Sequence, residues 1–281
     1  MTYRSLLVLL DQDKLCAART QVAIGLARQH DCHLVGVAPT GLIDLPMSAE
    51  VVAAQAEFSA LAWDALRDQA ERATDLFRDA CHAGGVKSFE AVIDEAEKAP
   101  SLVRHAHCSD LTILSQADPE NPGRRLEQGL VEQVVLHSAR PTLIIPYAGR
   151  FDAVGRSALV AWDDSREAAR ALADALPLLR TAGAVQVICW NEFDSGIDDK
   201  SLRSRLAAVG QWLLWQGVSA EVRVETTEAG VADAMLSRAS DLGADLIVMG
   251  AYGHSRWTER VLGGATRGLL QSMTVPVLMS H

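Results

Sequence analysis

The sequence lacks the features that mark membrane and exported proteins. A membrane-spanning helix needs about 20 consecutive apolar residues, and no such run occurs; the first apolar run, residues 6–10, stops at Asp11. This run is also too short for the core of a signal peptide, and no A-x-A-like cleavage site follows it. We therefore expect a cytoplasmic protein with no membrane partner.

Basic residues are scarce, because 26 Lys and Arg stand against 36 Asp and Glu and leave a formal charge of -10. Proteins that bind nucleic acid gain affinity by neutralising phosphates with Lys and Arg. An acidic chain without a basic run is therefore not expected to bind nucleic acid. Hydrophobic residues make up 49% and charged residues 22%, an ordinary balance for a folded protein, and 281 residues favour two domains.

Motifs for disulfides, metals and catalysis are also missing. The cysteines are five, an odd number, far apart and without a C-x-x-C pair, so we expect buried free thiols at Cys16, Cys32, Cys81, Cys108 and Cys189. His105 and His107 lie two apart in a helical region and make a poor metal pair. No G-x-S-x-G or H-E-x-x-H motif occurs. We therefore predict no metal site and no catalytic residue.

An internal duplication organises the chain. Residues 6–11 form an apolar run closed by an acid, and residues 159–163 repeat this pattern. The offset between the halves is 152 at this first strand and 135 at the fourth strands, residues 110–114 and 245–249. The first half is therefore 17 residues longer, and a loop with an extended helix around residues 41–84 accommodates the difference.

Each half reads as five short apolar strands alternating with amphipathic helices, a pattern typical of parallel sheets covered on both faces. The sequence thus predicts the α/β class, with two tandem doubly wound (Rossmann-like) five-stranded domains, residues 1–149 and 156–281. Residues 141–145 and 275–279 would leave apolar edges open, so we expect the halves to pair there as an intramolecular pseudo-dimer. A homodimer of the whole chain stays an open alternative.

One segment of the second half carries a pattern for phosphate binding. Glycines after a strand let backbone approach a ligand closely, and a helix that begins with Gly-Gly-x-Thr offers free N–H groups and its positive dipole end. The pattern matches neither a Walker A loop nor a G-x-G-x-x-G fingerprint. His254 is interpreted either as a phosphate donor or as a surface histidine. The residues are Met249, Gly250, Gly253, His254, Gly263, Gly264, Ala265 and Thr266.

These residues resemble the nucleotide motif of the universal stress protein family, tandem type. Gly250, Gly253 and Gly263 match the family spacing of Gly, two residues, Gly, nine residues, Gly. Gly264 replaces the hydroxyl residue that follows in the family, and Thr266 fits the second hydroxyl position. The resemblance implies a stress-response sensor or regulator that binds ATP, ADP or AMP, with Mg²⁺. It further implies that adenosine is held by Asp163 and by the backbone at Cys189 and Trp190.

The first half departs from this motif. Ser115, Asp118, Gln128 and Val131 stand where the second half has Gly250, Gly253, Gly263 and Thr266. An aspartate at the second glycine position places negative charge where a phosphate would lie. We therefore expect no nucleotide in the first half.

Two other functions remain open at this point. Gly264 and the tryptophans Trp212 and Trp215 favour an interaction module whose pocket is vestigial or takes an apolar ligand. A slow ATP hydrolase would need a group that positions water, for which Asp163 and His254 are the candidates. We expect weak ATP hydrolysis at most.

Overall fold

The computed structural model of the protein describes residues 2–41, 49–118, 129–192, 199–228, 230–253 and 264–281. In the N-terminal half, strands and helices alternate as the apolar runs predict. The first strand is buried from Leu6 to Leu9, as expected for a strand covered on both faces. The elements are β1 (Ser5–Leu9), α1 (Cys16–His30), β2 (His33–Pro39), α2 (Ala49–Gly84), β3 (Phe89–Asp94), α3 (Lys98–Ala106), β4 (Leu111–Ser115), α4 (Leu130–His137) and β5 (Thr142–Ile145).

The C-terminal half repeats this order with one local difference. The helical stretch after its first strand is divided in two, and a proline opens the short second helix, as expected for a residue that lacks an N–H group. The elements are β6 (Ser157–Ala161), α5 (Arg166–Asp174), α6 (Leu176–Leu179), β7 (Ala184–Glu192), α7 (Asp199–Trp215), β8 (Glu221–Thr227), α8 (Val231–Asp241), β9 (Leu246–Gly250), α9 (Gly264–Ser272) and β10 (Val277–Ser280).

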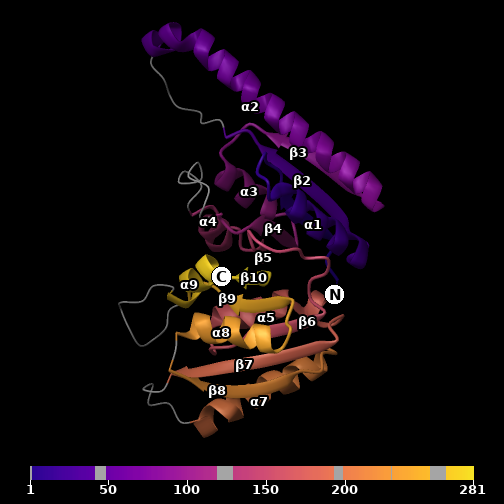
Figure 1. The fold of residues 1–281 in the computed structure, drawn as a ribbon, viewed down its shortest axis with the longest axis vertical. Coiled ribbons are helices and arrows are strands. Elements are labelled where there is room, and N and C mark those ends of the chain that lie inside the picture. The colour runs from indigo at the N-terminus through magenta and orange to yellow at the C-terminus, as the bar shows by residue number, and fades with distance from the viewer. Residues whose placement is uncertain (1, 42–48, 119–128, 193–198, 229, 254–263) are drawn as a thin grey trace.

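Among the described residues, ten strands form one sheet in the order β3-β2-β1-β4-β5-β10-β9-β6-β7-β8 (Figure 1). Neighbouring strands run parallel within each half. The central pair, β5 and β10, runs antiparallel, with Leu143 opposite Leu278 and Ile144 opposite Val277. All four side chains are fully buried. The predicted pairing of the final strands is thus confirmed, and the two halves form a pseudo-dimer within one chain.

This central pair fixes where the two candidate sites lie. The strands of each half are parallel to one another, but β5 opposes β10. The carboxyl ends of the N-terminal strands therefore lie at one edge of the sheet, and those of the C-terminal strands lie at the opposite edge. Any ligand site at a carboxyl edge belongs to one half alone.

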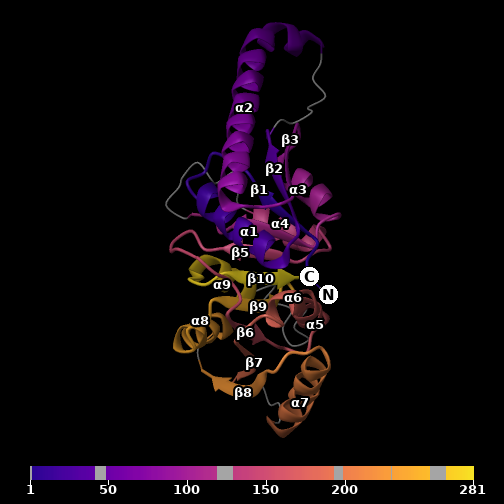
Figure 2. The ribbon, with the colours of Figure 1, turned by 90° about the vertical axis from the view of Figure 1, so that its right-hand side faces the viewer.

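Helices cover both faces of the sheet (Figure 2). On one face, α1, α2, α5, α6 and α7 contribute to a single apolar cluster that runs through both halves and includes Leu143 and Leu278 of the central strands. On the other face, α3 and α4 pack over the first half, and α8 and α9 over the second. Of the described helices, none combines the length and apolarity needed to cross a bilayer.

Helix α2 accounts for the longer first half. Its 36 residues span about 54 Å at 1.5 Å per residue, whereas the seven residues of β2 span about 23 Å. Among the α2 side chains that the structure describes, residues 63–84, the buried apolar ones include Ala70, Ala73, Phe77 and Cys81, all in the C-terminal part of the helix. The N-terminal part of α2 consequently extends past the sheet (Figures 1 and 2).

The cysteines are all free, as expected. The prediction that they are buried is confirmed for Cys32, Cys81 and Cys189. It is wrong for Cys108, which is exposed because it lies in the turn that follows α3. Cys16, at the start of α1, is half-buried.

Candidate functional site

The candidate site lies at the carboxyl ends of β9, β6 and β7, which are adjacent in the sheet. Strand β6 is the first strand of this half. One of its neighbours in the sheet, β7, is the next strand in the chain, and the other, β9, is the fourth. Strand order therefore reverses at β6, and in doubly wound sheets ligands bind at such a point. The residues that follow β6 and β9 therefore form the candidate ligand site.

Asp163 follows β6 by two residues and is exposed. Its Oδ1 accepts hydrogen bonds from Ser165 N at 3.0 Å and from Ser165 Oγ at 2.5 Å. Ser165 is the N-cap of α5, and its Oγ accepts from Ala168 N at 3.1 Å. The serine that caps α5 thus fixes the Asp163 carboxylate just after the end of β6.

Gly250 ends β9, where the backbone of α5 leaves no room for a side chain. A Cβ at Gly250 would lie 2.5 Å from Ala168 N and 2.6 Å from the carbonyl carbon of Glu167. Contacts this short do not occur at real Cβ atoms, so any larger residue here would displace strand or helix. Gly250 therefore sets the approach of α5 to β9.

The loop after β9 is joined to the start of α9. Tyr252 has a φ of 55°, an uncommon value for a residue other than glycine, and its N–H donates to Thr266 Oγ1 at 3.4 Å. Thr266 is buried, Ala265 is half-buried, and the helix begins at Gly264. His254 and Gly263 lie outside the described residues.

Strand β7 is longer than the sequence predicts. The apolar run at residues 185–189 predicts a strand that ends at Cys189, but the strand continues to Glu192, and Cys189 and Trp190 pair with Val224 and Glu225 of β8. The ladder between β6 and β7 ends earlier, at Ala161 and Ile188. Cys189 is buried and Trp190 is half-buried, and Met249 in β9 is buried. These three residues thus lie within strands that border the site, rather than in loops.

Sequence reasoning missed Glu167, which the structure places in the site. It is the second residue of α5 and only 3% exposed, and it forms an ion pair with Arg166. A Cβ at Gly253 would lie 2.9 Å from its Oε2, so the carboxylate lies against the loop that follows β9. In the sequence, Glu167 is an ordinary acid in the first turn of a helix, and only the closeness of α5 to β9 reveals its position.

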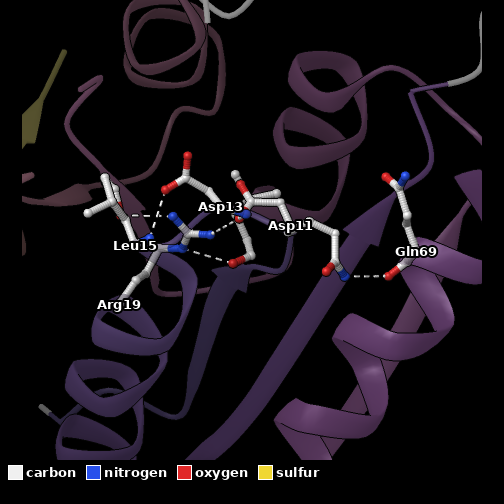
Figure 3. Close-up of polar contacts among 8 residues, drawn as sticks. Asp11, Asp13, Leu15, Arg19 and Gln69 are labelled. Carbon is white, nitrogen blue, oxygen red and sulfur yellow. Dashed lines mark hydrogen bonds and ion pairs between the residues drawn. The ribbon is translucent and has the colours of Figure 1, made fainter. Parts of the chain in front are cut away.

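In the N-terminal half, an arginine of α1 bonds to the ends of the corresponding strands (Figure 3). Arg19 of α1 is 1% exposed, and its Nε donates to Leu9 O at 2.8 Å. Its Nη1 donates to Ser115 Oγ at 2.8 Å, and its Nη2 donates to Asp11 Oδ1 at 3.0 Å. At the offset of 152, Arg19 corresponds to Ala171, which is fully buried. One guanidinium thus links the ends of β1 and β4, in the half that was predicted to bind no nucleotide.

Acidic groups in this half are held by cations. Burial raises the pKa of Asp11, but Arg19, Lys98 and the Asp13 N–H outweigh it, so the pKa lies below its ordinary value. Asp118, which aligns with Gly253, is 4% exposed, and its Oδ2 lies 2.7 Å from Lys14 Nζ. Both carboxylates are therefore already matched by charges within the protein.

His105 and the two tryptophans of α7 lie away from the candidate site in different surroundings. His105 Nε2 lies 3.3 Å from Asp94 Oδ2, which also accepts from Ser101 Oγ, so His105 belongs to a polar cluster at the end of β3. Trp215 is 75% exposed at the end of α7, so it is not a core residue. Trp212 is partly buried against the core.

Residues 156–281 match the model of the universal stress protein family. The C-terminal half of the chain is a universal stress protein domain. Over its full length the chain is similar to the crystal structure of a universal stress protein from Archaeoglobus fulgidus DSM 4304, with a TM-score of 0.74 and 17% identity, covering 98% of this chain and 95% of the other. A functionally unknown protein from Pseudomonas aeruginosa PAO1 gives a TM-score of 0.59 and 16% identity, covering 99% and 92%.

These structural likenesses span both halves, so they show the fold of the whole chain as that of tandem universal stress protein domains. At such low identity they show the fold alone. No curated protein matches the sequence.

Proposed function

We propose that residues 156–281 bind one adenine nucleotide, and that the chain acts in a cytoplasmic stress response as a sensor or regulator. In this proposal residues 1–149 are a degenerate universal stress protein domain without a nucleotide site. The family of the C-terminal domain supports the role, and the features at the ends of β6 and β9 support the site.

The observation that carries the proposal is the contrast between the two halves. In the C-terminal half, an exposed Asp163 follows β6, and the Gly250–Gly253 loop follows the adjacent strand β9 and is joined to α9 through Tyr252 and Thr266. In the N-terminal half, Arg19 links the ends of β1 and β4. This contrast supports a ligand site in the C-terminal half, because the polar groups at the corresponding strand ends of the other half bond to one another.

Each part of the proposed site would contact a different part of the nucleotide. N–H groups in the first turn of a helix have no partner within the helix and attract anions, so residues 263–266 would hold a phosphate. Asp163 would accept hydrogen bonds from ribose hydroxyls, and the backbone of Cys189 and Trp190 would face adenine. Mg²⁺ would arrive with the phosphates, since the described residues contain no group of three acids, histidines or cysteines that could hold a metal.

Isothermal titration of the full chain with AMP, ADP and ATP, with and without Mg²⁺, tests the proposal. We expect one nucleotide per chain, abolished by Gly253→Asp and by Gly263→Val. Thr266→Val should weaken the free energy of nucleotide binding by about 1–2 kcal/mol, because the Thr266 hydroxyl accepts a hydrogen bond from Tyr252 N and so positions the loop. Asp118→Gly is the matched change in the other half and should create no second site, because Arg19 remains.

Two results would contradict the proposal: two nucleotides per chain, or unaltered binding in both glycine variants. Mass spectrometry of the purified protein, denatured directly, separates it from an interaction module. A co-purified adenine nucleotide supports the sensor, whereas an apolar ligand supports the module.

A further inference from the structure

Glu167 brings a buried carboxylate to the loop that carries the glycines of the motif. It is 3% exposed, and its Oε2 would lie 2.9 Å from a Cβ at Gly253. This oxygen therefore occupies the space that a side chain at position 253 would take. A phosphate held by the same loop would lie within a few ångströms of the carboxylate, in a place where little water separates the two.

The carboxylate is ionised at neutral pH. Burial raises the pKa of Glu167, but the hydrogen bond from Arg166, the Glu167 N–H, and the charges of Arg166 and His281 outweigh it, so the pKa lies below its ordinary value. The Arg166 side chain is 77% exposed. Its charge is therefore screened by water, whereas the buried carboxylate acts on the loop at close range.

The first half carries a carboxylate on the loop itself. Asp118, which aligns with Gly253, is buried and paired with Lys14, which aligns with Arg166 at the offset of 152. The acid comes from the loop in one half and from the helix in the other. An acid paired with a cation at the start of the first helix is thus common to both halves.

We propose that Glu167 determines which nucleotide the C-terminal site accepts, because it disfavours each additional phosphate and selects a nucleoside monophosphate over a triphosphate. This inference rests on the proposed function, since it concerns the same site. Repulsion grows with the charge of the ligand, and AMP carries about two negative charges fewer than ATP. A glycine loop by itself does not restrict how many phosphates a ligand carries. A buried anion beside the loop does, because it repels each additional phosphate.

Titration of the full chain with AMP and ATP, without and with Mg²⁺, tests this inference through the ratio of the two affinities. The variant Glu167→Gln keeps the shape of the side chain and removes its charge. We expect it to shift the ratio about tenfold toward ATP, with a small change for AMP. Glu221→Gln, at the amino end of β8, is the control: it makes the same change in net charge at the other edge of the sheet and should leave the ratio unaltered.

Glu167→Asp keeps the charge but withdraws it by one methylene, and we expect an intermediate ratio. This variant maintains the test if Glu167→Gln does not fold. An unchanged ratio in the variants overturns the inference and leaves the nucleotide site intact. Weaker ATP binding by Glu167→Gln in Mg²⁺ also overturns it, because Glu167 would then be a ligand of the cation. Failure of the parent and all variants to bind any nucleotide instead overturns the proposed function.

Discussion

Replacing Arg19 by methionine should destabilise the protein strongly. Methionine retains much of the aliphatic volume but removes the charge and three hydrogen bonds, to Leu9 O, Ser115 Oγ and Asp11 Oδ1. The Asp11 side chain is 8% exposed and would become a buried charge without its main partner. Breaking one side of a buried ion pair costs about 3–5 kcal/mol, and we expect a loss of that size in the free energy of unfolding.

Urea denaturation followed by circular dichroism measures this loss. Arg78→Met is the control, because Arg78 and Asp75 form an exposed pair with side chains 45% and 73% accessible, and such pairs contribute less than about 1 kcal/mol. Asp11→Asn combined with Arg19→Met should cost clearly less than the sum of the single changes, because the double variant has no buried charge left alone. Equal losses for Arg19→Met and Arg78→Met would refute the reasoning.

Three further results follow from the contacts described. Gly250→Ala should lower the melting temperature by several degrees, because its Cβ would lie 2.5 Å from Ala168 N and overpacking of this kind costs about 1–3 kcal/mol. The pKa of Asp11 is depressed in the folded state, so its contribution to stability is present above about pH 4 and is lost as the pH falls; acid titration of Asp11→Asn should show a shallower decline between about pH 5 and 3. Tyr3→Phe removes the 2.9 Å hydrogen bond to Asp174 O between the halves, and its urea midpoint should reveal a loss of about 1 kcal/mol.

Most of the fold could be predicted from the sequence, because short apolar runs at matching intervals specify parallel strands. The pairing of β5 with β10 was also predictable, since the mostly apolar segments 141–145 and 275–279 would otherwise leave apolar sheet edges exposed. The division between α5 and α6 was not predicted, although Pro177 indicates it. The continuation of β7 through Trp190 to Glu192 was missed because polar residues there resemble a loop.

The residues at the strand ends were less predictable, because a charged residue in each half, Arg19 and Glu167, is buried by tertiary contacts. Arg19 sits among apolar helix positions, but a single arginine in an amphipathic helix usually faces solvent, and only the arrangement of β1 and β4 shows its partners. Glu167 is equally ordinary in sequence. The glycine spacing predicts a site at the carboxyl ends of the C-terminal strands, whereas the need for glycine at position 250 arises from α5 and could not be predicted from a loop motif.

The antiparallel pair at the centre of the sheet has a consequence for how such a protein diverges. In a dimer of two identical chains, every substitution appears in both subunits, so a ligand site can be lost only from both. Here β5 and β10 keep the same kind of contact within one gene product. An arginine can therefore arise at position 19 while position 171 remains alanine. In a single chain, one edge of the sheet can therefore carry a buried arginine while the other edge keeps its own residues, and the core that both halves share is preserved.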